Sequence, residues 1–287
     1  MSRNKNFTEG KFLTDIELLD ASDFPLEAYL YDETDAENFD ISEISRYLKG
    51  KGLFKEVKVE DSFLEKYSED IDRVSGGLAE TRIKNLEKSE RVFDVDGSHR
   101  NFEKKRITGE SAGKNNVLYD GFTMKNVFSG LIPDQKKNDS DLHLVFTDRF
   151  FATWKPATER YHARVSVYGV PSIISTTGIV DAPARPRGFY EVDQVDSENE
   201  ENVVVENRLK DHEGEFVYYG DERLSEIMKG YAMQAVFYQV STGPFCRDKN
   251  CRLYNPHLQK NILKAQLSEP EFCEEHQNIL ERMQDLS

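Results

Sequence analysis

The pattern of apolar and polar positions divides the chain into strand-like and helix-like segments. LEAYLYDE (26–33) is the first strand candidate, and LFKEVKVED (53–61) alternates apolar and polar residues like a second strand. Between them Ile41, Ile44 and Leu48 recur at helical spacing until two glycines end the pattern. A β-α-β opening of this kind favours an α/β fold, with a twisted mixed sheet flanked by helices.

The middle of the chain supplies the core elements of that fold. DLHLVFTDRFFATW (141–154) is the strongest candidate for a buried strand, and ARVSVYGVPSIIST (163–176) predicts a strand pair. LYDGFTMKNVFSGLI (118–132) predicts a core helix. Residues 94–118 are polar with scattered glycines, so we expect an insertion or a long loop there. We expect one domain over 23–287, preceded by a flexible N-terminal extension over 1–22.

The C-terminal part, residues 222–287, has a helical pattern throughout. Apolar residues from Leu224 to Ala235 repeat at three and four, and this helix should end at Gly243-Pro244. Two shorter helices should follow, opening at Asn255-Pro256 and at Ser268-Glu269-Pro270.

Composition and charge narrow the functional classes. The chain is 38% hydrophobic and 32% charged, with a formal net charge of -15. This acidity argues against general nucleic-acid binding and against anchoring on anionic lipid, because both need a basic face. The sequence offers neither an apolar run long enough to span a membrane nor a secretory signal. We therefore expect a cytoplasmic protein that does not bind membranes.

All three cysteines lie in one short stretch near the end of the chain. Their spacing is Cys246-x4-Cys251, then 21 residues, then Cys273-x2-His276. Two close ligand pairs separated by a helix-length spacer suit a tetrahedral zinc site, for which thiolate and imidazole are the preferred ligands. Cys273 and His276, three residues apart, should lie on the first turn of the last helix.

Two alternatives to this ligand set remain open. Cysteine is often a buried residue, so these three cysteines could be unrelated core side chains. His257 could also replace His276 as the fourth ligand. A set of four protein ligands leaves no position for substrate, so we expect one structural zinc per chain that staples the C-terminal segment.

The cysteine segment resembles the C-terminal part of the archaemetzincins, a branch of the metzincin zinc proteases. CRDKNCRL matches that family's C-x4-C-x-M pattern with Leu253 in the methionine position, and CEEH matches its CxxC with histidine last. The resemblance implies a metzincin-like fold in which Cys246, Cys251, Cys273 and His276 hold the family's structural zinc. CRLYNPH and RYHARVS are also similar to an archaeal family labelled as metallopeptidases.

The chain departs from the archaemetzincin pattern at the catalytic helix. Counted back from Cys246, the family's three histidines and its glutamate base fall on Ala235, Gln239, Phe245 and Val236. No His, Asp or Glu occurs from residue 227 to residue 245. Because a hydrolytic zinc needs protein ligands and a general base, the departure predicts a pseudoenzyme with no catalytic residues in this helix.

One basic segment stands out in the acidic chain. Residues 149–189 contain six basic and two acidic residues, a local net charge of +4. Arginine suits bidentate contact with carboxylate or phosphate. We therefore consider an anion- or peptide-binding cleft made of Arg160, His162, Arg164, Arg185 and Arg187. The alternative is that these arginines pair with the acidic residues of 191–226.

Two functional hypotheses follow. The favoured one is a non-proteolytic, zinc-binding protein that recognises a protein, a peptide or an anionic ligand. The alternative is a zinc metallopeptidase, or another metal-dependent hydrolase, with a rebuilt active site that involves His162 or His257. His143 could join such a site only if the fold brought the three histidines together.

Overall fold

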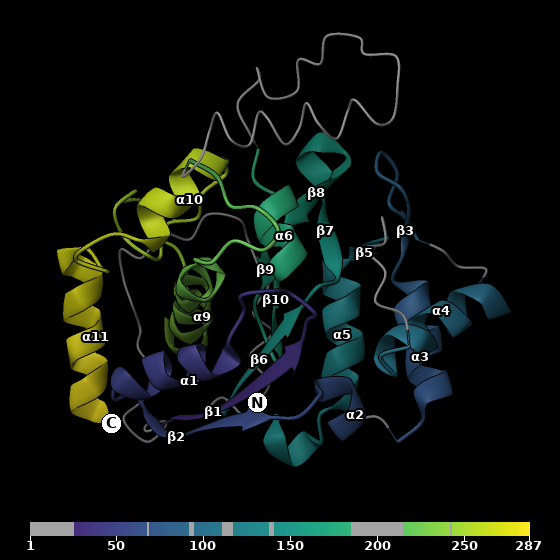
Figure 1. Ribbon diagram of the computed structural model, residues 1–287, viewed down its shortest axis with the longest axis horizontal. Helices are drawn as coiled ribbons and strands as arrows, with labels where there is room; N and C mark the ends of the chain where they lie inside the picture. Colours follow the sequence, from purple (N-terminus) through teal and green to yellow (C-terminus); the bar gives the residue numbers. More distant parts are fainter. Residues whose placement is uncertain are drawn as a thin grey trace, which may run out of the picture.

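A mostly parallel sheet of five strands lies at the centre of the computed structural model (Figure 1). The structure describes residues 26–67, 69–91, 95–110, 117–137, 141–184, 215–241 and 243–287. The strand order is β2-β1-β6-β10-β9, in which β9 is antiparallel to β10 and the other pairs are parallel. The strands are β1 (Leu26–Glu33), β2 (Phe54–Glu60), β6 (Asp141–Thr147), β9 (Ser166–Val167) and β10 (Ser172–Ser175).

Helices cover both faces of this sheet (Figure 1). Successive residues of a strand point to opposite faces, so Leu30 packs in the cluster on one face and Tyr31 in the cluster on the other. The Leu30 face is covered by α1 (Ile41–Gly50) and α9 (Leu224–Ser241). The Tyr31 face is covered by α2 (Phe63–Tyr67), α3 (Ile71–Glu80) and α5 (Gly121–Leu131). The predicted fold class, a mixed α/β sheet flanked by helices, is confirmed.

Smaller elements surround this core in the described part of the chain. A three-stranded sheet has the order β5-β7-β8, and β3 pairs with β4. The remaining elements are β3 (Ile83–Asn85), β4 (Glu90–Arg91), α4 (Gly97–Ile107), β5 (Leu118–Asp120), η2 (Asp134–Lys136), β7 (Phe150–Lys155), η3 (Pro156–Thr158), β8 (Arg160–Arg164), α6 (Thr176–Asp181), α10 (Gln259–Gln266) and α11 (Glu274–Leu286).

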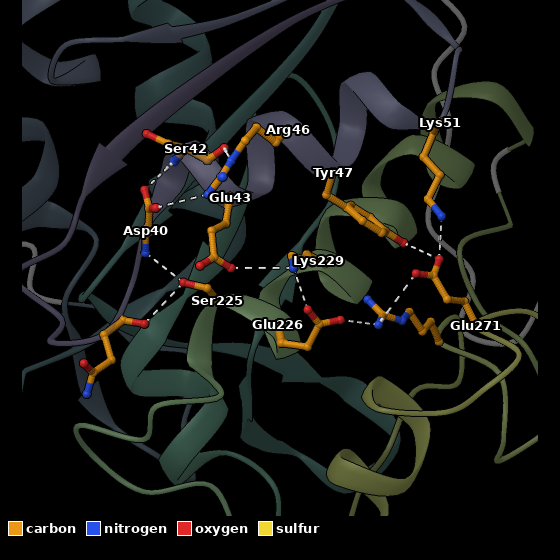
Figure 2. Close-up of polar contacts among 12 residues, drawn as sticks. Asp40, Ser42, Glu43, Arg46, Tyr47, Lys51, Ser225, Glu226, Lys229 and Glu271 are labelled. Atoms are coloured by element: carbon orange, nitrogen blue, oxygen red, sulfur yellow. Dashed lines mark hydrogen bonds and ion pairs between the residues drawn. The ribbon is translucent and has the colours of Figure 1, made fainter.

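The tail that follows α9 is joined to α1 and α9 by a half-buried network of charges (Figure 2). Arg252 pairs with Glu226 of α9 and lies 3.8 Å from Glu271 of the tail. Glu271 accepts a hydrogen bond from Lys51 at 2.5 Å. It accepts another at 2.9 Å from the hydroxyl of Tyr47, a residue of α1. The tail thus lies against α1, the first helix of the described residues, as well as against α9.

We expected an insertion or a long loop over 94–118. The described part of this segment contains a helix, α4. Asp96 caps α4 by accepting from the amide of Ser98 at 2.9 Å. Glu103, fully buried on this helix, accepts from Arg82 at 2.7 Å and from the Tyr119 hydroxyl at 2.9 Å. Because α4 docks through polar contacts, its sequence lacks the apolar stripe that marks an ordinary packed helix.

The single strand expected over 141–154 is in fact two strands of different sheets. β6 ends at Thr147 and β7 begins at Phe150, with Asp148 and Arg149 between them. The Thr147 hydroxyl accepts from the Arg149 amide at 3.2 Å and closes the turn. The continuous apolar pattern hides this break because both strands are buried.

The last two helices begin later than predicted. α10 begins at Gln259, because the segment around Leu258 is extended and bonds to the backbone of Ala184. α11 begins at Glu274 with Cys273 as its N-cap residue, while the Ser268 hydroxyl donates to the carbonyl of Ala265 in α10. The helix predicted from residue 222 corresponds to α9 and is confirmed.

Two expectations remain, one about the N-terminal extension and one about membrane-spanning segments. The N-terminal extension proposed for 1–22 lies outside the described residues. No helix found in the described ranges has both the length and the apolar character needed to cross a membrane.

Candidate metal centre

The first ligand pair lies on a compact turn that follows α9. The Cys246 amide donates to the carbonyl of Leu253 at 2.8 Å, and the Cys251 amide donates to the carbonyl of Asp248 at 3.2 Å. The Asp248 amide donates to the Cys246 sulfur at 3.3 Å. These bonds fold the six-residue stretch so that both sulfurs point to the same side, as a chelating loop requires.

The second ligand pair lies where the tail enters α11. Cys273 is the N-cap residue of this helix and His276 lies on its first turn, as the three-residue spacing predicted. The Arg252 amide donates to the carbonyl of Glu271 at 2.8 Å. This backbone bond joins the residue after Cys251 to the bend that precedes Cys273, and it holds the two ligand pairs together.

The four side chains form one cluster. Their donor atoms all lie within 4.8 Å of one another, and Cys246, Cys251 and His276 are buried while Cys273 is partly exposed. His257 is exposed and lies outside this group, so the histidine that joins the cysteines is His276.

The donor set and its spacing fit a tetrahedral zinc ion. Two sulfurs that are each bonded to tetrahedral zinc lie about 3.8 Å apart, and the Cys246 and Cys273 sulfurs are 3.7 Å apart. The Cys273 sulfur is 3.0 Å from Nδ1 of His276, about half an ångström closer than such a site requires. An outward movement of the imidazole by about half an ångström would bring this pair to the separation of two zinc ligands.

The three thiols lie close enough together for burial and their mutual hydrogen bonds to shift their pKa values. A hydrogen bond between Cys246 and Cys251 raises the pKa of Cys246 to about 12 and lowers the pKa of Cys251. Burial raises the pKa of Cys273. Several thiols crowded in a buried space resist becoming anions together, and a divalent cation removes that resistance by neutralising their charge.

The archaemetzincin resemblance places the catalytic residues on α9 and just after it. The side chains at those positions are buried and mostly apolar. Ala235 and Val236 are fully buried in the core, and Gln239 is 6% exposed. Phe245 packs against the same core. None of these four side chains carries the carboxylate, imidazole or thiol that a metal would need.

The basic residues of the proposed cleft are only partly within the described structure. Arg160, His162 and Arg164 alternate along β8 and therefore share one face of that strand. His162 Nε2 lies 2.7 Å from the Thr158 hydroxyl, and Arg164 donates to the Thr153 hydroxyl at 2.8 Å. The other two members of the set, Arg185 and Arg187, lie outside the described residues.

His143 is a core residue. Its ring stacks on Tyr29 at 4.9 Å, Nδ1 lies 3.3 Å from the Tyr31 hydroxyl, and Nε2 lies 3.2 Å from the carbonyl of Lys136. Burial lowers the pKa of this imidazole to about 4. Both ring nitrogens are engaged, and among the residues that the structure describes, His143, His162 and His257 do not form a metal-binding group.

Sequence reasoning missed the polar residues that support the cluster. Gln234 of α9 and Gln266 of α10 are fully buried and both donate to the carbonyl of Arg252. Glutamine is an ordinary helix residue, so its type and position give no signal of this role. A polar residue within the apolar run of α9 was the only available clue.

The fold and the site define an α/β protein that has a buried cluster of three cysteines and one histidine beside α9. The family described as "Probable metallopeptidase family (DUF6775)" matches residues 25–283. The chain therefore belongs to this family, which confirms the metallopeptidase relationship inferred from the sequence.

Two solved structures resemble the chain. Archaemetzincin from Methanopyrus kandleri is 11% identical with a TM-score of 0.41, covering 91% of this chain and 96% of its own. A zinc-dependent peptidase from Methanocorpusculum labreanum (strain Z) is 10% identical with a TM-score of 0.39, covering 88% and 99% respectively. No curated protein matches the chain.

Proposed function

We propose that Cys246, Cys251, Cys273 and His276 bind one zinc ion per chain, and that this ion is structural. Four protein donors complete a tetrahedral shell and leave no position for water or substrate. The ion would join the turn after α9 to the start of α11. Its binding energy, on the order of 10 kcal/mol in small zinc modules, would then stabilise the folded tail.

We further propose that the protein binds a ligand and does not cleave peptides. The observation that carries this proposal is the composition of α9. Ala235, Val236 and Gln239 offer neither ligands nor a general base, and the Cys3His cluster is the only metal-capable group found in the described part of the chain. Reduced thiols as ligands also suit a cytoplasmic location.

The ligand-binding surface that we propose is the β8 face with Arg160, His162 and Arg164. An anionic ligand or an acidic peptide is the chemical class that suits two guanidinium groups beside an imidazole. An Arg160→Ala/Arg164→Ala variant should weaken binding of a fluorescent acidic peptide while its zinc content stays unchanged. Equal binding by both proteins would remove this surface from the proposal.

Metal counting and a cleavage assay test the main proposal together. Purified protein should contain about one zinc per chain that resists mild chelation, and it should not cleave a mixed peptide library. Cys251→Ala should lose the zinc and unfold the tail, whereas Gln239→Ala should keep its full metal content. Normal zinc content and melting temperature in Cys251→Ala would contradict the assigned ligand set.

A second candidate is an active metallopeptidase, or another metal-dependent hydrolase, with a rebuilt site that involves His162 or His257; it is considered because the family is described as a probable metallopeptidase family. This candidate predicts a second, labile metal ion per chain and peptide cleavage that returns when metal is added back. Either result would replace the binding role, and the structural zinc would stand unaffected.

A further inference from the structure

Gln234 makes three hydrogen bonds from the buried face of α9. Its Oε1 accepts from the Tyr168 hydroxyl at 2.6 Å. Its Nε2 donates to the carbonyl of Tyr254 at 3.0 Å and to that of Arg252 at 3.4 Å. Because one partner is a hydroxyl and the other two are carbonyls, the orientation of the amide is fixed by its partners.

The two carbonyls belong to the turn that carries Cys251. Arg252 follows this cysteine directly, and its carbonyl also accepts from Nε2 of Gln266 at 3.2 Å. The Tyr254 amide in turn donates to the carbonyl of Cys251 at 2.8 Å. The peptide groups just after the ligand are therefore held by side chains of α9 and α10.

We propose that Gln234 is a positioning residue of the metal centre. It fixes the backbone that follows Cys251, so that this sulfur points at the other three donors before metal arrives. Through Tyr168, which follows β9, the same amide ties the centre to the edge of the main sheet. This inference rests on the proposed zinc site and names the side chain that organises it.

A glutamine is needed here because the position requires two donors and one acceptor on the same group. Methionine has a similar length and volume but supplies neither. Loss of outer contacts that orient metal ligands typically weakens metal affinity by about 10- to 100-fold. We expect a loss in this range for Gln234→Met, together with a less regular ligand geometry.

Gln259→Met is the matched control. Gln259 is equally buried and also bonds backbone groups, donating to the carbonyls of Ile179 and Val180 at 2.8 Å each and accepting from the Val217 amide at 3.2 Å. None of these partners lies in the cysteine turn. Its replacement should lower stability without changing the metal centre.

The experiment measures zinc affinity by chelator competition and the visible spectrum of the Co²⁺-substituted protein. Tetrahedral thiolate sites give intense, geometry-sensitive Co²⁺ bands, which a general loss of stability does not alter. Gln234→Met should bind zinc about 10- to 100-fold more weakly and shift these bands, while Gln259→Met should match the unchanged protein in both measurements.

Tyr168→Phe provides a second variant if Gln234→Met does not fold. It keeps the amide but removes its anchor, so zinc affinity should fall by less than in Gln234→Met, and the Co²⁺ bands should still shift. Unchanged affinity and spectra in Gln234→Met, or in Tyr168→Phe where Gln234→Met does not fold, would overturn the positioning role while leaving the zinc site intact. A wild-type protein that binds neither Zn²⁺ nor Co²⁺ would overturn both.

Discussion

Gly230 on α9 faces the side chain of Gln266 on α10, and this contact leaves no room for a methyl group. A Cβ at residue 230 would lie 1.6 Å from Oε1 of Gln266 and 2.7 Å from its Cδ. Gln266 is fully buried, and its Nε2 bonds the carbonyl of Arg252. Replacement of Gly230 by alanine must therefore push this side chain out of its place.

The net effect of Gly230→Ala can be worked out from three contributions. Alanine is favoured over glycine in a helix by about 1 kcal/mol. Overpacking a well-filled core costs about 1–3 kcal/mol, and loss of the Gln266 hydrogen bond costs about 1 kcal/mol more. We expect a net destabilisation of about 1–3 kcal/mol, which lowers the melting temperature by about 2–4 °C per kcal/mol.

Urea unfolding followed by circular dichroism measures this change, and Gly130→Ala is the matched control. Gly130 lies on α5 with nothing within 4 Å of the added Cβ, so alanine there should stabilise the protein by about 0.5–1 kcal/mol. Gln266→Ala should largely remove the penalty of Gly230→Ala in the double variant. If both glycine replacements stabilise the protein equally, Gly230 of α9 and Gln266 of α10 do not lie as close together as described.

Two further changes probe buried carboxyl groups. Burial raises the pKa of Asp32 to about 6, so its contribution to stability is present at low pH and is lost as the pH rises through 6. Asp32 is partly buried, so Asp32→Asn should raise the free energy of unfolding of the protein by about 1–2 kcal/mol at pH 8 and by almost nothing at pH 4. Thermal melts at both pH values measure this difference. Glu103→Gln should destabilise the protein by about 3 kcal/mol, because it removes the buried negative charge that lies 3.6 Å from Arg149 and pairs with Arg82. Urea unfolding checks this second change, and a loss below 1 kcal/mol would mean that α4 is not docked through Glu103.

The sequence predicts those parts of the fold whose cause is local. The apolar run within 26–33 and the spacing of Ile41, Ile44 and Leu48 depend only on near neighbours, and both elements are present. α4 has no such signal, because Glu103 finds its partners 16 and 21 positions away in the sequence. Helices held by distant polar contacts leave no periodic pattern to detect.

The candidate site divides in the same way. Cys246 and Cys251, like Cys273 and His276, form pairs whose spacing is itself the chelating geometry, so their cluster was predictable. Gln234 was not, because its partners lie 18, 20 and 66 positions away. A glutamine acquires such a role only when the fold brings specific carbonyls within reach.

The hydrogen bond from Gln284 to the carbonyl of Lys51 spans 233 positions of sequence. Together with the contact of Lys51 with Glu271, it makes the end of α1 depend on residues that lie more than 200 positions later in the sequence. Contacts this distant are closed late, because the chain must give up loop entropy before they form. The C-terminal end of α1 therefore gains its contacts with Glu271 and α11 only after the rest of the fold has brought the tail to it.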